Sequence, residues 1–222
     1  GRVHSVGSFG LGDCPGGRYG IVLQGCALGC QFCHNPDSWE MHNPAAEMTD
    51  AESLLEQALR YRKYWGRDGK KGGITVSGGE PMLQMPFVTE LFELAHRKGV
   101  HTTLDTAGQP YREDAEYQKA FERMMAATDL VMLDLKAMDA QLHRRVTGLD
   151  NANILAMARK LSDMGKPMWI RPVLVPGLTD GEDDLQQMAA FIQTLQTVER
   201  VEILPYPTLG LSKWPRLGID YH

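Results

Sequence analysis

Short apolar runs alternate along this chain with longer segments in which apolar residues recur every three or four positions. The runs lie at residues 19–24, 73–77, 100–105, 130–134, 168–175 and 201–204. Runs of this length, bounded by glycine, proline or polar residues, are typical of buried strands. The segments between them have helical periodicity. We therefore predict six strands separated by helices near residues 50–65, 88–95, 114–127, 153–164 and 185–195.

Two of the predicted helices have recognisable start signals. Thr49 and Glu52 have the spacing of a capping box, and so do Thr179 and Glu182. In a capping box the hydroxyl and the carboxylate each accept a hydrogen bond from a free backbone N–H of the first turn. We expect Thr49 and Thr179 to be the N-cap residues.

The alternation of strands and helices predicts a parallel sheet with right-handed crossovers. Unusual segments, rich in cysteine, glycine or charge, follow the strands one after another. In parallel α/β folds this edge of the sheet carries the chemistry, and a curved sheet brings all six strand ends to one space. We expect an α/β fold, a partial (β/α)6 barrel of parallel strands. Neither a repeat nor a linker interrupts the pattern, so residues 1–222 are predicted to form a single domain.

Composition and charge narrow the function classes. The chain has 222 residues, of which 43% are hydrophobic and 23% charged, as is ordinary for a soluble globular protein. The formal net charge of −5 disfavours a nucleic-acid partner, because phosphate binding needs a basic face. No apolar run approaches the roughly 20 residues that cross a bilayer, and the first ten residues lack a signal-peptide core. We therefore expect no membrane partner.

The four cysteines, Cys14, Cys26, Cys30 and Cys33, all lie near the start of the chain. Disulfides would be expected to join distant loops, whereas tight clustering indicates a metal site in a reducing compartment. We therefore expect a cytoplasmic protein.

The spacing of Cys26, Cys30 and Cys33 suits a cuboidal iron–sulfur cluster in which one iron keeps no protein ligand. A structural zinc held by these thiolates with His34 or Cys14 is the alternative. Zinc sites normally use two separated pairs of ligands, and here there is one run of ligands. Plain buried thiols are the third interpretation. The spacing favours the cluster.

Glycines and charged residues at later strand ends suggest a ligand site beside the cysteines. Gly78 and Gly79 would let the backbone approach a ligand closely, unless they only form a turn. Glu80 follows them either as a ligand contact or as a support for the loop. Asp105 and Asp134 end two neighbouring strands, where an Asp is often a helix cap.

Two cations accompany these acids. Lys136 follows Asp134 by two residues, and such paired charges suit a zwitterionic ligand. Arg171 ends the fifth strand, where it would clamp a carboxylate or the backbone of a partner, or form a surface salt bridge.

The CxxxCxxC run with Phe32 before its last cysteine resembles the signature of the radical S-adenosylmethionine (SAM) superfamily. The resemblance implies a [4Fe–4S] cluster on Cys26, Cys30 and Cys33, with SAM chelating the fourth iron. It also implies reductive cleavage of SAM to a 5′-deoxyadenosyl radical. Phe32 would pack near the adenine, and backbone around His34 would read the adenine edge. The segment 78–80 would approach the methionine part of SAM.

A closer resemblance covers nearly the whole chain. The segment C-H-N-P-D-S-W at 33–39, with V-S-G-G-E at 76–80 and L-P-Y at 204–206, is similar to the activases of glycyl radical enzymes. The absence of a cysteine-rich insert between Trp39 and Thr49 favours the compact type that acts on pyruvate formate-lyase. This type abstracts hydrogen from a glycine of its protein substrate. The resemblance also implies flavodoxin or ferredoxin as electron donor and a monomeric enzyme.

The resemblance assigns further site residues. The residues implied in SAM binding are Phe32, Cys33, His34, Gly78, Gly79, Glu80, Asp105, Asp134, Leu135, Lys136, Arg171, Val173 and Leu204. A monovalent cation would lie among Asp105, Thr106, Met132 and Asp134, because hard oxygen ligands suit it. The chain departs from the family at Cys14, Ala107 and Pro207, where glycine, asparagine and histidine are common.

Other functions stay open at this point. The chain would alternatively activate another glycyl radical enzyme, or act by radical chemistry on a small molecule. A zinc-stabilised binding module without catalysis is the alternative from another class.

Overall fold

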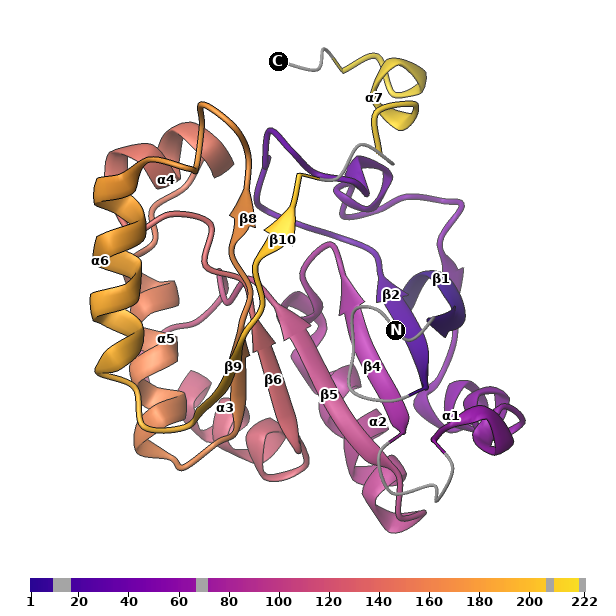
Figure 1. The fold of residues 1–222 in the computed structure, drawn as a ribbon. Helices are drawn as coiled ribbons and strands as arrows, with labels where there is room; N and C mark the ends of the chain where they lie inside the picture. Colours follow the sequence, from indigo (N-terminus) through magenta and orange to yellow (C-terminus); the bar gives the residue numbers. More distant parts are fainter. Residues whose placement is uncertain (10–16, 67–71, 207–209, 220–222) are drawn as a thin grey trace.

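The computed structural model describes residues 1–9, 17–66, 72–206 and 210–219 (Figure 1). Six strands run parallel and lie side by side in chain order: β2 (Arg18–Leu23), β4 (Gly73–Gly78), β5 (His101–Thr106), β6 (Leu130–Leu133), β7 (Met168–Ile170) and β9 (Val198–Val201). Helices connect successive strands, as βαβ crossovers require. The predicted α/β class and the order of its parallel strands are confirmed.

Two strands that were not predicted extend the sheet beyond β2. Strand β1 (Arg2–Phe9) pairs antiparallel with β2, and β3 (Glu47–Met48) pairs antiparallel with β1. The expectation of a wholly parallel sheet is therefore wrong at this edge. Strand β1 carries no continuous apolar run, because a strand near a sheet edge is stabilised by its backbone pairing and needs little side-chain burial.

The fifth and sixth predicted strands are each divided. After β7 the chain continues as β8 (Val173–Leu174), and after β9 as β10 (Leu204–Pro205). Strands β8 and β10 form a separate two-stranded parallel sheet. Pro172 lies at the break, and proline has no N–H to donate to a ladder. The small sheet lies beyond the carboxyl ends of β7 and β9 (Figure 1).

The structure contains more helices than were predicted. The α-helices are α1 (Ala51–Leu59), α2 (Met85–Arg97), α3 (Ala115–Ala126), α4 (Ala140–Thr147), α5 (Ala152–Asp163), α6 (Glu182–Gln193) and α7 (Lys213–Arg216). Short 3₁₀ helices are η1 (Pro36–Ser38), η2 (Arg62–Tyr64) and η3 (Pro81–Gln84). Helices α4 and α7 are too short for a periodic signal. None of the helices in the described ranges has the length and hydrophobicity needed to cross a membrane.

Both predicted capping residues are wrong. Asp50 caps α1 by accepting a hydrogen bond from the Ser53 N–H, and Gly181 is the N-cap of α6. The Thr179 hydroxyl instead donates to the Val173 carbonyl at 2.7 Å. For α1, the carboxylate one position after the threonine is an equally good N-cap, so the spacing alone does not decide between them. Helix α6 instead begins two positions after Thr179, at a glycine that makes no side-chain cap.

The core lies between the sheet and its helices. The predicted apolar face of α2 is buried, with Val88, Leu91 and Phe92 fully inaccessible. They belong to the same apolar cluster as Ile74 of β4 and Leu104 of β5. Helices α5 and α6 lie along the other end of the sheet (Figure 1).

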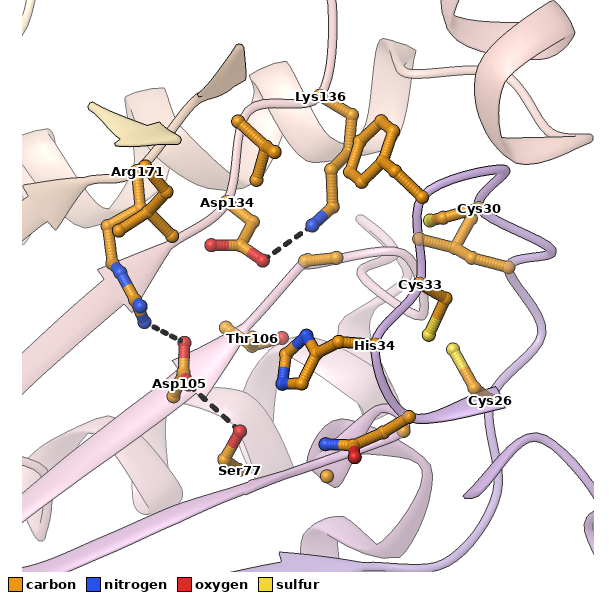
Figure 2. A pocket seen from close by; sticks show the side chains of 18 of the residues that line it. Cys26, Cys30, Cys33, His34, Ser77, Asp105, Thr106, Asp134, Lys136 and Arg171 are labelled. Atoms are coloured by element: carbon orange, nitrogen blue, oxygen red, sulfur yellow. Dashed lines mark hydrogen bonds and ion pairs between the residues drawn. The ribbon is translucent and has the colours of Figure 1, made fainter. Parts of the chain in front are cut away.

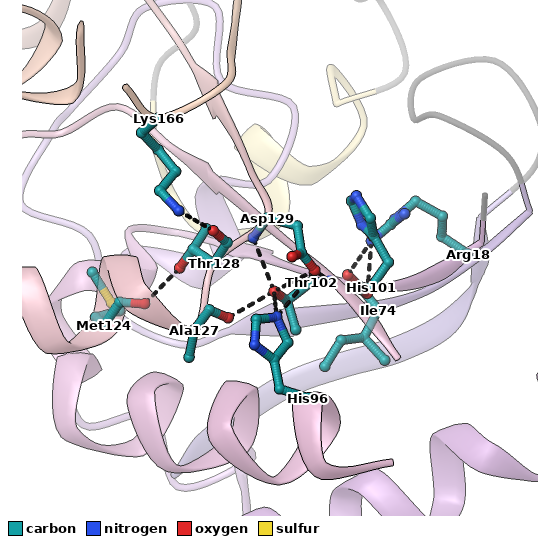
Figure 3. Close-up of polar contacts among 10 residues, drawn as sticks. All are labelled: Arg18, Ile74, His96, His101, Thr102, Met124, Ala127, Thr128, Asp129 and Lys166. Atoms are coloured by element: carbon teal, nitrogen blue, oxygen red, sulfur yellow. Dashed lines mark hydrogen bonds and ion pairs between the residues drawn. The ribbon is translucent and has the colours of Figure 1, made fainter. Parts of the chain in front are cut away.

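A belt of polar contacts joins the amino ends of the strands (Figure 3). Arg18, 1% exposed, donates to the carbonyls of Ile74 and His101 and lies 3.2 Å from His101 Nδ1. Because a guanidinium only donates, this ring nitrogen must be the unprotonated acceptor. In the same belt Asp129 accepts hydrogen bonds from the Thr102 N–H and from His96. The polar groups of this belt form hydrogen bonds with one another. The cavity described below lies at the opposite, carboxyl ends of the strands.

Candidate active site

A cavity of about 490 Å³ opens at the carboxyl ends of the parallel strands. Its lining comes from the loops after β2, β4, β5 and β6, and from β8 and β10. The lining residues are Cys26, Leu28, Cys30, Phe32, Cys33, His34, Asn35, Trp39, Ser77, Gly78, Gly79, Asp105, Thr106, Ala107, Asp134, Lys136, Arg171, Val173, Leu204, Pro205 and Tyr206. The volume falls within the roughly 300–1,000 Å³ of small-molecule sites. The expected convergence of strand ends on one space is therefore confirmed.

The loop after β2, residues 25–39, carries the three cysteines and is called the cysteine loop below. Gly25 begins it at a φ of 106°, a conformation that glycine adopts without strain. The N–H groups of Gly29 and Gln31 donate to the carbonyls of Thr147 and Val146, at the end of α4. The middle of the loop is thus anchored to α4, and the N–H groups of Gly25 and Cys26 join its two ends by donating to the Ser38 and Trp39 carbonyls.

The three thiols are unpaired and face the cavity (Figure 2). Burial raises the pKa of Cys26 and of Cys30 to about 12, and burial also raises the pKa of Cys33. Apolar residues, Leu28 and Ala107, pack around them. Neutral thiols are stable there without metal, whereas a metal would take the place of their protons.

The three thiols line one cavity, a placement compatible with a cuboidal cluster. In the described part of the chain, no group of three or more His, Cys, Asp and Glu side chains converges closely enough to hold one metal ion. A tetrahedral zinc needs all its ligand atoms within about 2.3 Å of one point. A cuboidal cluster binds each thiolate at a different iron, so it suits thiols spread around a cavity. Cys14, the other suggested zinc ligand, lies outside the described residues.

Gly78 and Gly79 bring β4 against the cysteine loop. The N–H of Gly79 donates to the Leu23 carbonyl at 3.0 Å, and the N–H of Glu80 donates to the Gly25 carbonyl at 2.7 Å. A side chain on Gly78 would collide with the backbone of Leu23, and one on Gly79 with the Gly25 carbonyl. These glycines therefore do more than form a turn, because the close approach of the two loops requires them.

Glu80 supports the site from behind. It is fully buried and does not line the cavity. Its carboxylate accepts hydrogen bonds from the Thr106 hydroxyl at 2.6 Å, the Met82 N–H at 2.9 Å and the Ala107 N–H at 3.0 Å. Burial raises the pKa of Glu80 to about 7, and these donors limit the rise. Of the two predicted roles, the structure favours support of the loop.

Lys136 and Asp134 form an ion pair at the cavity wall. The ammonium Nζ lies 2.6 Å from Asp134 Oδ2 and 5.6 Å from the centre of the Phe32 ring (Figure 2). Burial lowers the pKa of Lys136, but Asp134 and Cys30 outweigh it, so the pKa lies above its usual value. Lys136 is therefore a permanent cation beside an aromatic ring.

Asp105 and Arg171 form a second ion pair across the cavity. Asp105 accepts hydrogen bonds from the Ser77 hydroxyl at 2.8 Å and from Arg171 at 3.0 Å (Figure 2). Arg171 lies 3.7 Å from Glu202, which in turn pairs with Arg200 at 2.8 Å. Arg171 is 7% exposed, so it is not a surface salt-bridge residue. Sequence reasoning missed Glu202, because it follows a strand with no motif around it.

Most predicted site residues lie in the cavity wall. The exceptions are Glu80, Leu135 and Met132, whose side chains are buried outside the lining. The imidazole of His34 itself points into the cavity, where only its backbone was expected to matter (Figure 2). Trp39, Ala107 and Tyr206 also line the cavity, although the sequence assigned them no role. The only signal for them in the sequence is that each lies in or beside a segment that carries a predicted site residue. Pro207 lies outside the described residues.

Comparisons with known proteins agree with this site. The family model of the radical SAM superfamily matches residues 21–192. A pyruvate formate-lyase-activating enzyme of Streptococcus mutans is 51% identical over 221 residues, which cover 100% of this chain and 83% of the relative. An enzyme of the same name from Staphylococcus aureus is 48% identical, over 100% of this chain and 87% of the relative.

Solved structures share the fold. A domain of a pyruvate-formate lyase-activating enzyme from Bacteroides vulgatus has a TM-score of 0.56 at 28% identity, covering 62% of this chain and 82% of that domain. SuiB of Streptococcus suis, bound to its precursor peptide SuiA, has a TM-score of 0.66 at 19% identity, covering 88% and 42%. The second likeness concerns the fold alone. The cysteine loop, the parallel sheet and the near-50% identities agree, and the chain belongs to the radical SAM superfamily and, within it, to the family of pyruvate formate-lyase-activating enzymes.

Proposed function

We propose that this enzyme activates pyruvate formate-lyase by generating a radical on one of its glycines. The observation that carries the proposal is the cavity, which places three thiols opposite two ion pairs at the open ends of the strands. Its relatives of about 50% identity carry the same activity in their names. The enzyme uses a [4Fe–4S] cluster and SAM, as its superfamily does.

The residues of the cavity suit these two cofactors. Cys26, Cys30 and Cys33 would hold the cluster, and one iron would stay free for SAM. When bound, the reduced cluster and SAM supply a 5′-deoxyadenosyl radical that abstracts hydrogen from glycine. The backbone of Gly78 and Gly79 would receive the methionine part of SAM, for which a bare backbone is suited.

The charged residues would orient SAM in the same cavity. Lys136 is a fixed cation that suits a carboxylate, and Asp105 and Asp134 suit ammonium or hydroxyl groups. Phe32 offers a ring face for the adenine, with His34, Val173 and Leu204 completing the wall. By burying the reacting groups and holding them in line, these residues perform much of the catalysis.

A monovalent cation would bind beside Asp134. Its Oδ1 atom is buried and accepts no hydrogen bond from the described residues, whereas Oδ2 contacts Lys136. A buried carboxylate oxygen without a partner is costly unless a cation or water meets it. Asp105, Thr106 and the Met132 carbonyl are the other proposed ligands, because β5 and β6 pair Asp105 with Met132.

Further parts of the proposal concern the setting of the enzyme. We propose a cytoplasmic, monomeric, single-domain enzyme that receives its electron from flavodoxin or ferredoxin. Free, clustered cysteines support a reducing compartment. A single-electron donor of this kind supplies what a low-potential cluster needs.

Electron paramagnetic resonance tests the proposal. The reduced, cluster-loaded enzyme is mixed anaerobically with SAM and pyruvate formate-lyase, and a glycyl radical signal is expected on the lyase. Cys26→Ala, Cys30→Ala and Cys33→Ala should each abolish the signal and cluster binding, whereas Cys14→Ala should retain both. SAM cleavage without a glycyl radical would refute pyruvate formate-lyase as the substrate.

A further inference from the structure

Helix α7 lies against the cysteine loop, although the two are far apart in the sequence. It sits beside η1 and apart from the helices that cover the sheet (Figure 1). Trp214 of α7 is 4% exposed, and its indole N–H donates to the Cys33 carbonyl at 3.0 Å. A side-chain hydrogen bond to the backbone of one of the three clustered cysteines therefore comes from this helix.

The neighbouring residues of α7 hold the same part of the loop. Lys213 Nζ donates to Asn35 Oδ1 at 2.7 Å and to Asp37 Oδ1 at 3.0 Å. Gly210 lies so close to the His34 backbone that any side chain there would collide with it. The segment 210–214 thus contacts residues 33–37 through three separate groups.

Trp39 links this contact to the first cysteine. Its ring packs edge-to-face against Trp214, with ring centres 5.4 Å apart and an interplanar angle of 87°. Its carbonyl accepts a hydrogen bond from the Cys26 N–H at 3.1 Å, and its side chain lines the cavity. The two tryptophans together contact the backbone of Cys26 and of Cys33.

We propose that Trp214 is a positioning residue for the cluster, through which α7 holds Cys26 and Cys33 at a fixed separation. The inference rests on the cluster chemistry of the proposed function. The hydrogen bond to the Cys33 carbonyl and the packed ring restrict the motion of the cysteine loop. The loop therefore loses less conformational entropy when the irons bind. Such outer contacts are known to govern how firmly ligands hold a metal. Trp214 does not line the cavity, so it would act through the cysteine loop.

Iron release from the loaded enzyme tests the proposal. Cluster-loaded Trp214→Phe keeps a ring but loses the N–H, and it should release iron to a chelator about fivefold faster than the wild type, the effect of one lost hydrogen bond. The matched control is Trp65→Phe, because Trp65 is 3% exposed and packs beside Gly72, at the start of β4. This control should release iron at the wild-type rate. The electron paramagnetic resonance spectrum of the reduced cluster should also change in Trp214→Phe. It should stay the same in Trp65→Phe.

A second pair of variants keeps the test decisive if Trp214→Phe does not fold. Lys213→Met removes both contacts to the loop and should also speed iron release, whereas Lys213→Arg should restore the slow rate. Equal release rates in Trp214→Phe and Trp65→Phe, or in Lys213→Met and wild type, would overturn the inference while the proposed function stands. A wild-type enzyme without a four-iron cluster would refute both.

Discussion

At the scale of single residues, Lys136 has the clearest expected effect. Its charge opposes the raised pKa of Cys30, and its ammonium group pairs with Asp134 at 2.6 Å. Lys136→Met should weaken SAM binding by about tenfold or more, since it removes the cation proposed to meet the SAM carboxylate and a hydrogen bond to a charged group contributes about 1.5–3 kcal/mol. Calorimetric titration of the cluster-loaded enzyme with SAM measures the effect.

The control for this substitution is Lys160→Met. Lys160 forms an ion pair of similar length, 2.7 Å, with Glu122, but on the surface. Surface pairs contribute little, so the variant should bind SAM as the wild type does. Equal SAM affinity in Lys136→Met and wild type would show that Lys136 is only structural.

Residue spacing explains which parts of the site the sequence could reveal. Cys26, Cys30 and Cys33 lie within eight consecutive residues, so a local motif is enough to predict that they form one site. Glu80 belongs to a visible motif, but its supporting role depends on hydrogen bonds to residues 106 and 107. The contact between Trp214 and Cys33 spans 181 positions, and no local pattern encodes it.

At the scale of elements, Asp184 joins α6 to the loop after β6. Its carboxylate accepts hydrogen bonds from the Met138 N–H at 2.9 Å and the Asp139 N–H at 2.7 Å. Asp184→Ala should lower the free energy of unfolding by about 2–4 kcal/mol, because it leaves two N–H groups unsatisfied. Urea unfolding measures the loss, and the exposed Asp183→Ala serves as control. Similar losses in both variants would contradict this role.

The sequence predicted the helices and strands whose side chains are buried in a regular pattern. It did not predict the strands that are held mainly by backbone pairing with a neighbouring strand. The six parallel strands and the apolar face of α2 follow from runs and periods in the sequence. Strand β1 lacks such a run. Pro172 marks the break after β7, but the pairing of β8 with β10 that follows both breaks joins residues about 30 positions apart, which no local pattern specifies. The predicted start of α1 failed because Thr49 and Asp50 are adjacent and both can cap. That of α6 failed because the Thr179 hydroxyl bonds to β8 and the helix begins after Gly181.

At the scale of the whole molecule, the polar belt couples stability to pH. Burial, followed by the charge of Arg18, lowers the pKa of His101 below 6.5. The unfolded chain therefore binds a proton at higher pH than the folded chain does. Stability from this residue is complete above about pH 6.5 and is lost as the pH falls through the lower, folded-state pKa.

His101→Asn tests this coupling. The asparagine amide oxygen can accept the hydrogen bond of Arg18 but does not titrate between pH 5 and 8. Urea unfolding at pH 7.5 and 5.5 should show a smaller loss of stability in the variant than in the wild type. The same loss in both proteins would remove His101 from the pH dependence.

The distance in sequence between Cys33 and Trp214 has a consequence during synthesis. A ribosome adds roughly 5–20 residues per second. The 181 residues from His34 to Trp214 therefore take roughly 9–36 s to make. Throughout that interval the nascent chain carries three thiols that α7 does not yet cover. Until the last described helix emerges, these thiols depend on a reducing environment to stay unoxidised, and the contacts of α7 with the cysteine loop form only after that.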